Sequence, residues 1–185
     1  MSKIIGIDLG TTYSAIAQLD DLGNPEVLAS TDTNKKITSS AVYLKEKNVV
    51  VGDKALDALI ATPKNVVTET KRQMENDVVF STQKGEWIDK EGAEEGCYSP
   101  AQVSSFILGK LKGYTSDVKK VVITVPALFA EKARVATLDA AKLAGIEVIE
   151  LINEPTAAAC YYASLPAVKK ITGKVLVFDL GGGTF

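Results

Sequence analysis

The sequence predicts an α/β protein in which helices cover the faces of a mixed sheet. Short apolar runs alternate with helix-length segments over residues 98–185, and this alternation favours a sheet whose strands are joined through helices. The tripeptide Asp-Leu-Gly also occurs twice, at residues 8–10 and 179–181, each time directly after an apolar run. Because such a run is typical of a buried strand, both tripeptides are expected at strand ends.

The first unit is predicted to be a three-stranded meander. Residues 3–9 form an apolar strand, and residues 13–19 alternate enough to be its hairpin partner. Residues 20–25 are rich in turn-forming residues, and residues 26–29 suit a third, short strand.

The middle of the chain is predicted to be an inserted α+β subdomain. Its candidate strands are short, at residues 41–44, 49–51 and 78–80, and a helical stretch covers residues 54–61. Charged residues are scattered and the pattern is irregular, so the insertion is placed at residues 37–97.

Regular alternation returns at Ser99, which can cap a helix that has Pro100 at its first position. A β-prone strand follows at residues 121–125, and an Ala- and Leu-rich helix at residues 133–144 is ended by Gly145. The next strand covers residues 146–152 and leads into an Ala-rich helix that starts near Pro155. Residues 175–179 are predicted to be the last strand.

Composition excludes several functional classes. The chain has 185 residues, 46% of them hydrophobic, which is enough for a sizeable core. Its 23 acidic and 21 basic residues give a net charge of −2, which argues against nucleic acid or an anionic membrane as the main partner. No apolar run approaches the roughly 20 residues of a membrane span, and the N-terminus lacks the pattern of a secretory signal.

The cysteine and histidine counts narrow the chemistry further. Cys97 and Cys160 are too few and too far apart to indicate a disulfide or metal framework, so they are expected to be plain thiols in a reducing, cytoplasmic compartment. The chain contains no His, which excludes Ser-His catalysis and His-ligated metals. Any catalysis must use carboxylates, Lys, hydroxyls and the backbone.

The two Asp-Leu-Gly segments together predict phosphate binding. Each alone is compatible with a simple turn, but Gly10-Thr11-Thr12 and the stretch 181–184 both offer backbone N–H groups and hydroxyls after a buried strand. An Asp beside such a turn suits a hydrated Mg²⁺. Neither segment matches the P-loop or the dinucleotide-binding glycine pattern. Two copies suggest two related lobes that grip one polyphosphate.

Three further features have ordinary explanations from the residues alone. Glu154 can be a catalytic carboxylate or simply an acidic residue at a helix start, which the helix dipole favours. Lys71, in the segment 70–73, is predicted to be a surface lysine. Tyr161 and Tyr162 are predicted to serve helix packing.

Four segments, in order, resemble the seventy-kilodalton heat-shock chaperones, the DnaK-like family. They are residues 5–14 (IGIDLGTTYS), 122–127 (VITVPA), 151–159 (LINEPTAAA) and 178–185 (FDLGGGTF), with a weaker match around Asn65 and residues 70–72. The resemblance implies lobe I of an actin-like ATPase domain. It implies a ribonuclease-H-like core at 1–36 and 98–185 with the insertion at 37–97, and places the second lobe and a peptide-binding domain outside this chain.

The resemblance also implies roles for individual residues. ATP or ADP would be bound through its phosphates by Gly10, Thr11, Thr12, Tyr13, Gly181, Gly182, Gly183 and Thr184, with Thr184 also catalytic. Asp8 and Asp179 would hold water molecules of Mg²⁺, and K⁺ is expected nearby. Lys71 would orient the attacking water, and Glu154 would help to place that water and the hydrated metal. Pro126 and Arg134 match the family's relay to the peptide-binding domain.

Some positions depart from the family pattern. Leu128 stands where Tyr is usual, and Glu150 stands where many members carry an Arg that helps to dock J-domain cochaperones. Residues 75–97 resemble the family poorly. The expected partners are unfolded peptides, a nucleotide-exchange factor and, more doubtfully because of Glu150, a J-domain protein. The alternatives are an actin-like filament protein, which would lack a peptide-binding domain, and a sugar kinase, which would need a catalytic Asp and a sugar pocket.

Overall fold

A mixed six-stranded sheet forms the centre of the protein. The computed structural model describes residues 4–45, 48–116, 118, 120–165, 168 and 173–181. The sheet has the order β12-β11-β1-β2-β3, with β4 paired to β2 outside this path. β1 is parallel to β11, and β11 is parallel to β12, whereas β2 pairs antiparallel with both β1 and β3. Its strands are β1 (Ile4–Asp8), β2 (Tyr13–Leu19), β3 (Pro25–Val27), β4 (Thr38–Ser39), β11 (Lys120–Val125) and β12 (Glu147–Asn153).

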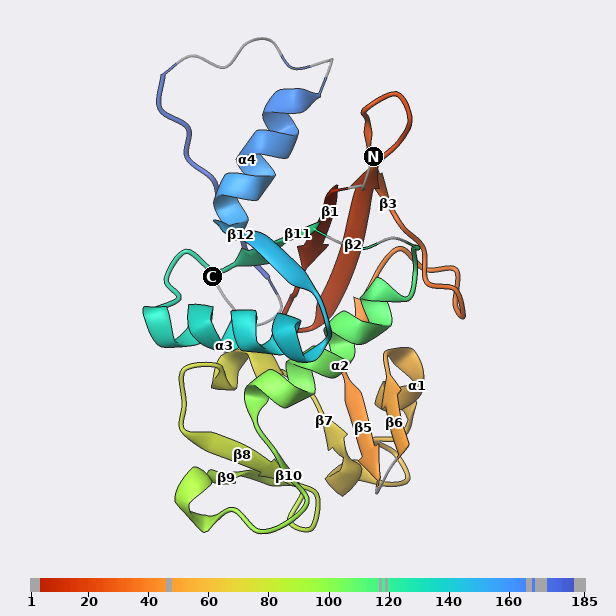
Figure 1. Cartoon of the computed structure of the whole chain (residues 1–185), viewed down its shortest axis with the longest axis vertical. Helices are drawn as coiled ribbons and strands as arrows, with labels where there is room; N and C mark the ends of the chain where they lie inside the picture. Colours follow the sequence, from red (N-terminus) through yellow and green to blue (C-terminus); the bar gives the residue numbers. More distant parts are fainter. Residues whose placement is uncertain are drawn as a thin grey trace.

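Two helices, α2 (Pro100–Lys112) and α3 (Glu131–Leu143), supply the apolar cover for one face of the sheet (Figure 1). Buried side chains of β1 and β11, such as Ile5, Ile7 and Ile123, join the same core cluster as Ile107 and Leu111 of α2. The predicted cap of α2 is confirmed. The Ser99 hydroxyl accepts from the Gln102 N–H at 3.2 Å, and the Gln102 side chain accepts from the Ser99 N–H at 2.8 Å. This reciprocal capping box satisfies donors that the first helical turn leaves free.

The opposite face of the sheet carries small and polar residues beside apolar ones such as Ile4 and Val122. Side chains alternate between the two faces of a strand. Gly6 and Asp8 alternate with the buried Ile5 and Ile7, so they face away from α2. Helix α4 (Glu154–Ser164) follows β12 directly and extends beyond the sheet in Figure 1, and it has no buried residue. This face is therefore available for a ligand.

Two small sheets lie between β4 and α2 in the sequence. One has the order β6-β5-β7 and the other β10-β8-β9. Their strands are β5 (Val42–Lys45), β6 (Asn48–Val51), β7 (Val66–Val67), β8 (Val78–Ser81), β9 (Glu86–Asp89) and β10 (Cys97–Tyr98). Short helical turns connect them: α1 (Asp53–Asp57), η1 (Pro63–Asn65), η2 (Thr70–Gln73) and η3 (Lys90–Gly92). β4, which precedes these two sheets in the sequence, pairs with β2 and so belongs to the main sheet.

The prediction of a buried strand at residues 175–179 is wrong. Residues 174–181 are described, but they form no strand, and Leu176 and Leu180 are each 81% exposed. An apolar run becomes a strand only where a neighbour supplies hydrogen-bond partners, and the sequence pattern does not reveal that neighbour.

The helix expected at residues 54–61 also differs, since α1 ends at Asp57 and a turn follows. Its expected second half includes Ile60, which is 93% exposed, so no packing stabilises further helical turns. Gly145 ends α3 as predicted, with a φ of 65° that a glycine adopts without strain. Cys97 and Cys160 are free thiols, and no helix in the described ranges is long and apolar enough to cross a membrane.

Candidate functional site

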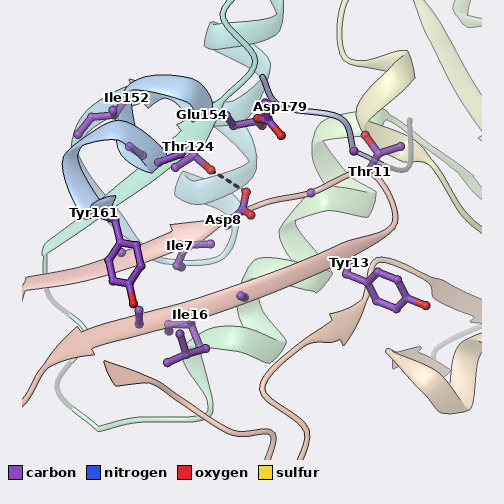
Figure 2. A pocket seen from close by; sticks show the side chains of 18 of the residues that line it. Ile7, Asp8, Thr11, Tyr13, Ile16, Thr124, Ile152, Glu154, Tyr161 and Asp179 are labelled. Atoms are coloured by element: carbon purple, nitrogen blue, oxygen red, sulfur yellow. Dashed lines mark hydrogen bonds between the residues drawn. The ribbon is translucent and has the colours of Figure 1, made fainter. Parts of the chain in front are cut away.

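A pocket of about 680 Å³ lies on the face of the sheet opposite α2 (Figure 2). The sheet contributes small or polar side chains, including Gly6, Asp8, Ala15, Ala17 and Thr124. The remaining wall comes from the β1–β2 turn, η2, the start of α4 and the segment near residue 179. Its lining residues are Gly10, Thr11, Thr12, Tyr13, Lys71, Glu154, Asp179 and Gly181. The structure therefore gathers the sequence-predicted residues of both Asp-Leu-Gly segments at one place.

The turn after β1 is held in shape by two serine hydroxyls. The Gly10 N–H donates to Ser14 Oγ at 3.2 Å, and the Ser40 hydroxyl donates to the Gly10 carbonyl at 2.8 Å. The two hydroxyls are hydrogen-bonded to each other at 2.9 Å. A Cβ at Gly10 would lie 2.0 Å from the Tyr13 carbonyl oxygen. Glycine is thus required here by a close backbone approach.

Thr11 has a hydroxyl that is poised for a ligand. The residue is only 6% exposed and lines the pocket, yet its Oγ1 has no hydrogen-bond partner among the residues that the structure describes. A buried hydroxyl without a partner costs free energy. A ligand oxygen in the pocket would remove that cost. Thr12 and Tyr13, by contrast, are exposed.

Asp8 is oriented by the neighbouring parallel strand. Asp8 and Thr124 are register partners of β1 and β11, and the Thr124 hydroxyl donates to Asp8 Oδ1 at 2.7 Å. Figure 2 shows this bond as a dashed line at the floor of the pocket. The second carboxylate oxygen is left for water or a hydrated cation.

Lys71 is buried, so the prediction of a surface lysine is wrong. It is 7% exposed, and its Nζ donates to the Leu9 carbonyl at 2.6 Å and to the Glu154 carboxylate. The ring of Phe129 lies 5.9 Å from the same Nζ. A buried charge is tolerated when it is paired and hydrogen-bonded. The ion pair therefore places one cation and one carboxylate together on the pocket wall.

The carboxylates suit a hydrated metal better than a directly ligated one. Asp8, Glu154 and Asp179 all line the pocket. Within the described ranges, however, no three Asp, Glu, Cys or His groups lie close enough to ligate a metal together. Mg²⁺ usually keeps several of its waters and binds few carboxylates, so this arrangement fits it through water. Gly182, Gly183 and Thr184 lie outside the described residues.

Comparisons with known proteins agree with this geometry. The family model described as "Hsp70 protein" matches residues 4–185. The chain belongs to the Hsp70 family. The chain is 40% identical over 187 residues to the chaperone protein DnaK of Thermotoga petrophila and to that of Thermotoga maritima. The alignment covers 98% of this chain but only 29% of each relative.

Membership of the Hsp70 family confirms the expected actin-like fold and decides against the filament protein and the sugar kinase. The chain spans less than a third of the length of the DnaK relatives that it matches.

Pro126 and Arg134, the two residues expected to act as the Hsp70 relay, lie outside the pocket. Pro126 lines a second cavity of about 750 Å³, whose wall also includes Lys71 and Glu154. Arg134 donates through Nε to the Phe129 carbonyl at 3.2 Å and through Nη2 to Asn153 Oδ1 at 2.7 Å. Since Asn153 directly precedes Glu154, Arg134 connects α3 to the residue beside the ion pair.

Sequence reasoning missed several supports of this Hsp70 site. Thr124 could have been found by aligning the predicted strands 3–9 and 121–125 as parallel neighbours, because their ends then coincide. Ser40 and the Leu9 carbonyl gave no such signal, because no predicted strand pairing brings Ser40 to Gly10 or Lys71 to Leu9.

Proposed function

We propose that this chain is the ATP-binding and ATP-hydrolysing lobe of a DnaK-like chaperone. One observation supports this most directly: the ion pair of buried Lys71 and half-buried Glu154 borders the same pocket as the Asp8 carboxylate and the Thr11 hydroxyl, which has no partner among the described residues. A cation, a hydroxyl donor and carboxylates around one cavity match the requirements of phosphoryl transfer, which depends on positioning and electrostatics.

Phosphate binding is assigned to the two turns. The turn at residues 10–13 offers the Thr11 and Thr12 hydroxyls, the Tyr13 side chain and a backbone held by Ser14 and Ser40. Gly181 also lines the pocket, and the second predicted phosphate-binding segment continues through Gly182, Gly183 and Thr184, which lie outside the described residues. The two turns would grip the β- and γ-phosphates of ATP or ADP.

Asp8, Asp179 and Glu154 would hold Mg²⁺ through its waters, with K⁺ as a further expected ion. Bound Mg²⁺ neutralises developing charge on the phosphate oxygens. Thr124 contributes by fixing the orientation of the Asp8 carboxylate. Such prior orientation saves the reorganisation that a solvated carboxylate would need during reaction.

Lys71 would orient the attacking water and stabilise charge on the transferring γ-phosphoryl group. Its ammonium is held between the Leu9 carbonyl and the Glu154 carboxylate, so its position does not depend on solvent. In a buried environment an interaction with developing charge is stronger than in water. Glu154, which contacts the lysine, would place the same water.

The decisive experiment compares Mg·ATP binding by the complete gene product and its variants. Thr11→Val keeps the shape of the side chain but removes the hydroxyl, and we expect ATP affinity to fall by about tenfold. Thr70→Val is the matched control, because Thr70 is also buried with an unpartnered hydroxyl but does not line the pocket. Its affinity should equal that of the unchanged protein. Absence of Mg·ATP binding and hydrolysis in the unchanged protein would refute the proposed function.

The wider role is also part of the proposal. ATP turnover would be coupled to binding and release of unfolded peptides, with nucleotide-exchange and J-domain cochaperones as partners, in the cytoplasm. The relatives named chaperone protein DnaK support this role. A division into a core of residues 1–36 and 98–185 and a subdomain of residues 37–97 is supported by the two separate small sheets. The pairing of β4 with β2 argues for moving the first boundary to about residue 40.

A further inference from the structure

The turn that follows Lys71 is attached to the start of α3 by two contacts. Glu75 Oε1 accepts a hydrogen bond from the Ala130 N–H at 3.1 Å, and Ala130 is the N-cap residue of α3. Two residues further on, Asp77 forms an ion pair with Lys132 at 2.7 Å. An acidic group beside the free N–H groups of a helix start is favoured by the helix dipole, so this attachment is electrostatically favourable.

These contacts complete a second connection between Lys71 and Glu154, the two members of the ion pair. Ala130 follows Phe129, whose carbonyl accepts from Arg134, and Arg134 also donates to Asn153. Asn153 is the neighbour of Glu154 in the sequence, and Glu75 lies four residues after Lys71. Lys71 and Glu154 are therefore joined directly in the pocket and indirectly through the start of α3.

The short turn around Lys71 depends on such attachments for its position. The η2 element has only four residues, and the bond from the Met74 N–H to the Lys71 carbonyl is long, at 3.4 Å. Met74 is buried and accepts from the Ser104 hydroxyl of α2 through its sulfur at 3.6 Å, which holds one side of the turn. Glu75, the next residue, holds the other side against α3.

We propose that Glu75 is a positioning residue for Lys71, acting by fixing the turn against the N-terminus of α3. This inference rests on the proposed function, because the consequence of moving Lys71 is a slower hydrolysis of ATP. Small displacements of a positioned group reduce the rate of the chemical step far more than they reduce substrate binding.

Single-turnover hydrolysis and Mg·ATP affinity of the complete gene product test the proposal. We expect Glu75→Ala to slow hydrolysis by about fivefold, with the ATP dissociation constant within about twofold of the unchanged value. Glu75→Gln retains an oxygen that accepts from the Ala130 N–H, and it should recover most of the rate. Glu131→Gln is the matched control, because it removes a charge from the first turn of the same helix without touching the Glu75 bond. It should leave the rate unchanged.

Two further variants separate positioning from general destabilisation. Ala130→Pro removes the donor N–H at a φ of −69°, which proline adopts readily, and it should reproduce the slow rate of Glu75→Ala. In a Lys71→Ala background, Glu75→Ala should have no further effect, because its action passes through Lys71.

An unchanged rate in Glu75→Ala, or an equal loss of rate with and without Lys71, would overturn the proposal. If the unchanged protein binds and hydrolyses ATP and Glu75→Ala has no effect on the rate, only the positioning role is refuted. A gene product that fails to hydrolyse ATP refutes the proposed function, and the positioning role with it.

Discussion

At the scale of single residues, the site is organised by polar groups that obtain their hydrogen-bond partners from distant parts of the chain. Lys71 and Glu154 are 83 residues apart in the sequence, and Asp8 and Thr124 are 116 residues apart. The first contact forms only when η2 meets the start of α4, and the second only when β11 has paired with β1. The site is therefore sensitive to substitutions that remove one partner of either contact.

Lys71→Ala is the first such substitution. In the complete gene product we expect Mg·ATP binding to stay largely intact while hydrolysis falls by about two orders of magnitude or more, because the lysine acts mainly in the transition state. Single-turnover hydrolysis measures this effect, with Lys35→Ala, which breaks an exposed ion pair, as the control. A rate within about twofold of the unchanged protein would remove Lys71 from the mechanism.

Gly10→Ala tests the phosphate-binding turn. The new Cβ would meet the Tyr13 carbonyl at 2.0 Å, so the turn must open, and we expect ATP affinity to fall by more than about tenfold. Gly109→Ala in α2 is the control, because a Cβ there meets nothing within 4 Å. Calorimetric titration distinguishes the two. Equal affinities would show that the turn does not contact the nucleotide.

At the scale of elements, the sequence predicted correctly the helices and strands whose structure is decided by their local residue pattern. The apolar run of residues 3–9 and the capping residue Ser99 are local signals, and the predicted strand and cap are both confirmed. The apolar run at residues 175–179 was misassigned because a strand requires a neighbour that no local pattern names.

The same limit applies to the site. Asp8 was predicted from its place at a strand end, and the structure puts it in the pocket. The burial of Lys71 could not be predicted from its surroundings, because η2 itself is a short and irregular element. The resemblance to a family supplied the role of this residue where pattern reasoning favoured the surface.

Strand β12 provides a test of cochaperone recognition. It is the edge strand of the main sheet, and Glu150 is exposed on it. We expect a generic J-domain protein to stimulate the ATPase of the complete gene product weakly, because two acidic surfaces repel each other. Glu150→Arg should increase the stimulation, whereas Glu147→Arg on the same strand should not. Strong stimulation of the unchanged protein with no gain in Glu150→Arg would contradict this account.

At the scale of the whole molecule, our proposal makes residues 1–185 one wall of a nucleotide site. We expect this chain by itself to fold, because the main sheet and its helices form a continuous core. It should bind Mg·ATP with a dissociation constant well above about 1 μM, because ordering the nucleotide against a single wall costs as much as in a complete site and gains fewer contacts. Calorimetric titration and phosphate release measure this. Submicromolar binding would show that one lobe suffices.

Acid should weaken the contacts that join the loops to the helices. Hydrogen bonds from Lys35 and then Ser39 lower the pKa of Asp53, and a hydrogen bond from Lys110 lowers that of Asp32. A carboxylate with a lowered folded-state pKa stabilises the fold above its unfolded pKa of about 4, and this stabilisation disappears as the pH falls through the lower folded value. The destabilisation caused by Asp53→Asn should therefore be present at neutral pH and vanish towards about pH 2.

This effect should be small, below about 1 kcal/mol, because Lys35 is largely exposed and water screens the pair. Thermal unfolding at several pH values measures it, with Asp21→Asn in the exposed turn after β2 as the control. A constant difference between Asp53→Asn and the unchanged protein from neutral to acidic pH would contradict the assignment.

The parallel pairing of β1 with β11 has a consequence for biosynthesis. β1 leaves the ribosome early, but its partner residues begin only at Lys120. At about 5–20 residues per second, translation separates the two strands by on the order of ten seconds. During this interval one edge of the β1–β2 hairpin has free backbone groups, and Ile5, Ile7 and Ile16 lack the helices that bury them in the folded protein. The nascent chain therefore passes through a stage that favours pairing with other chains, and its yield in a cell should depend on how quickly residues 100–125 follow.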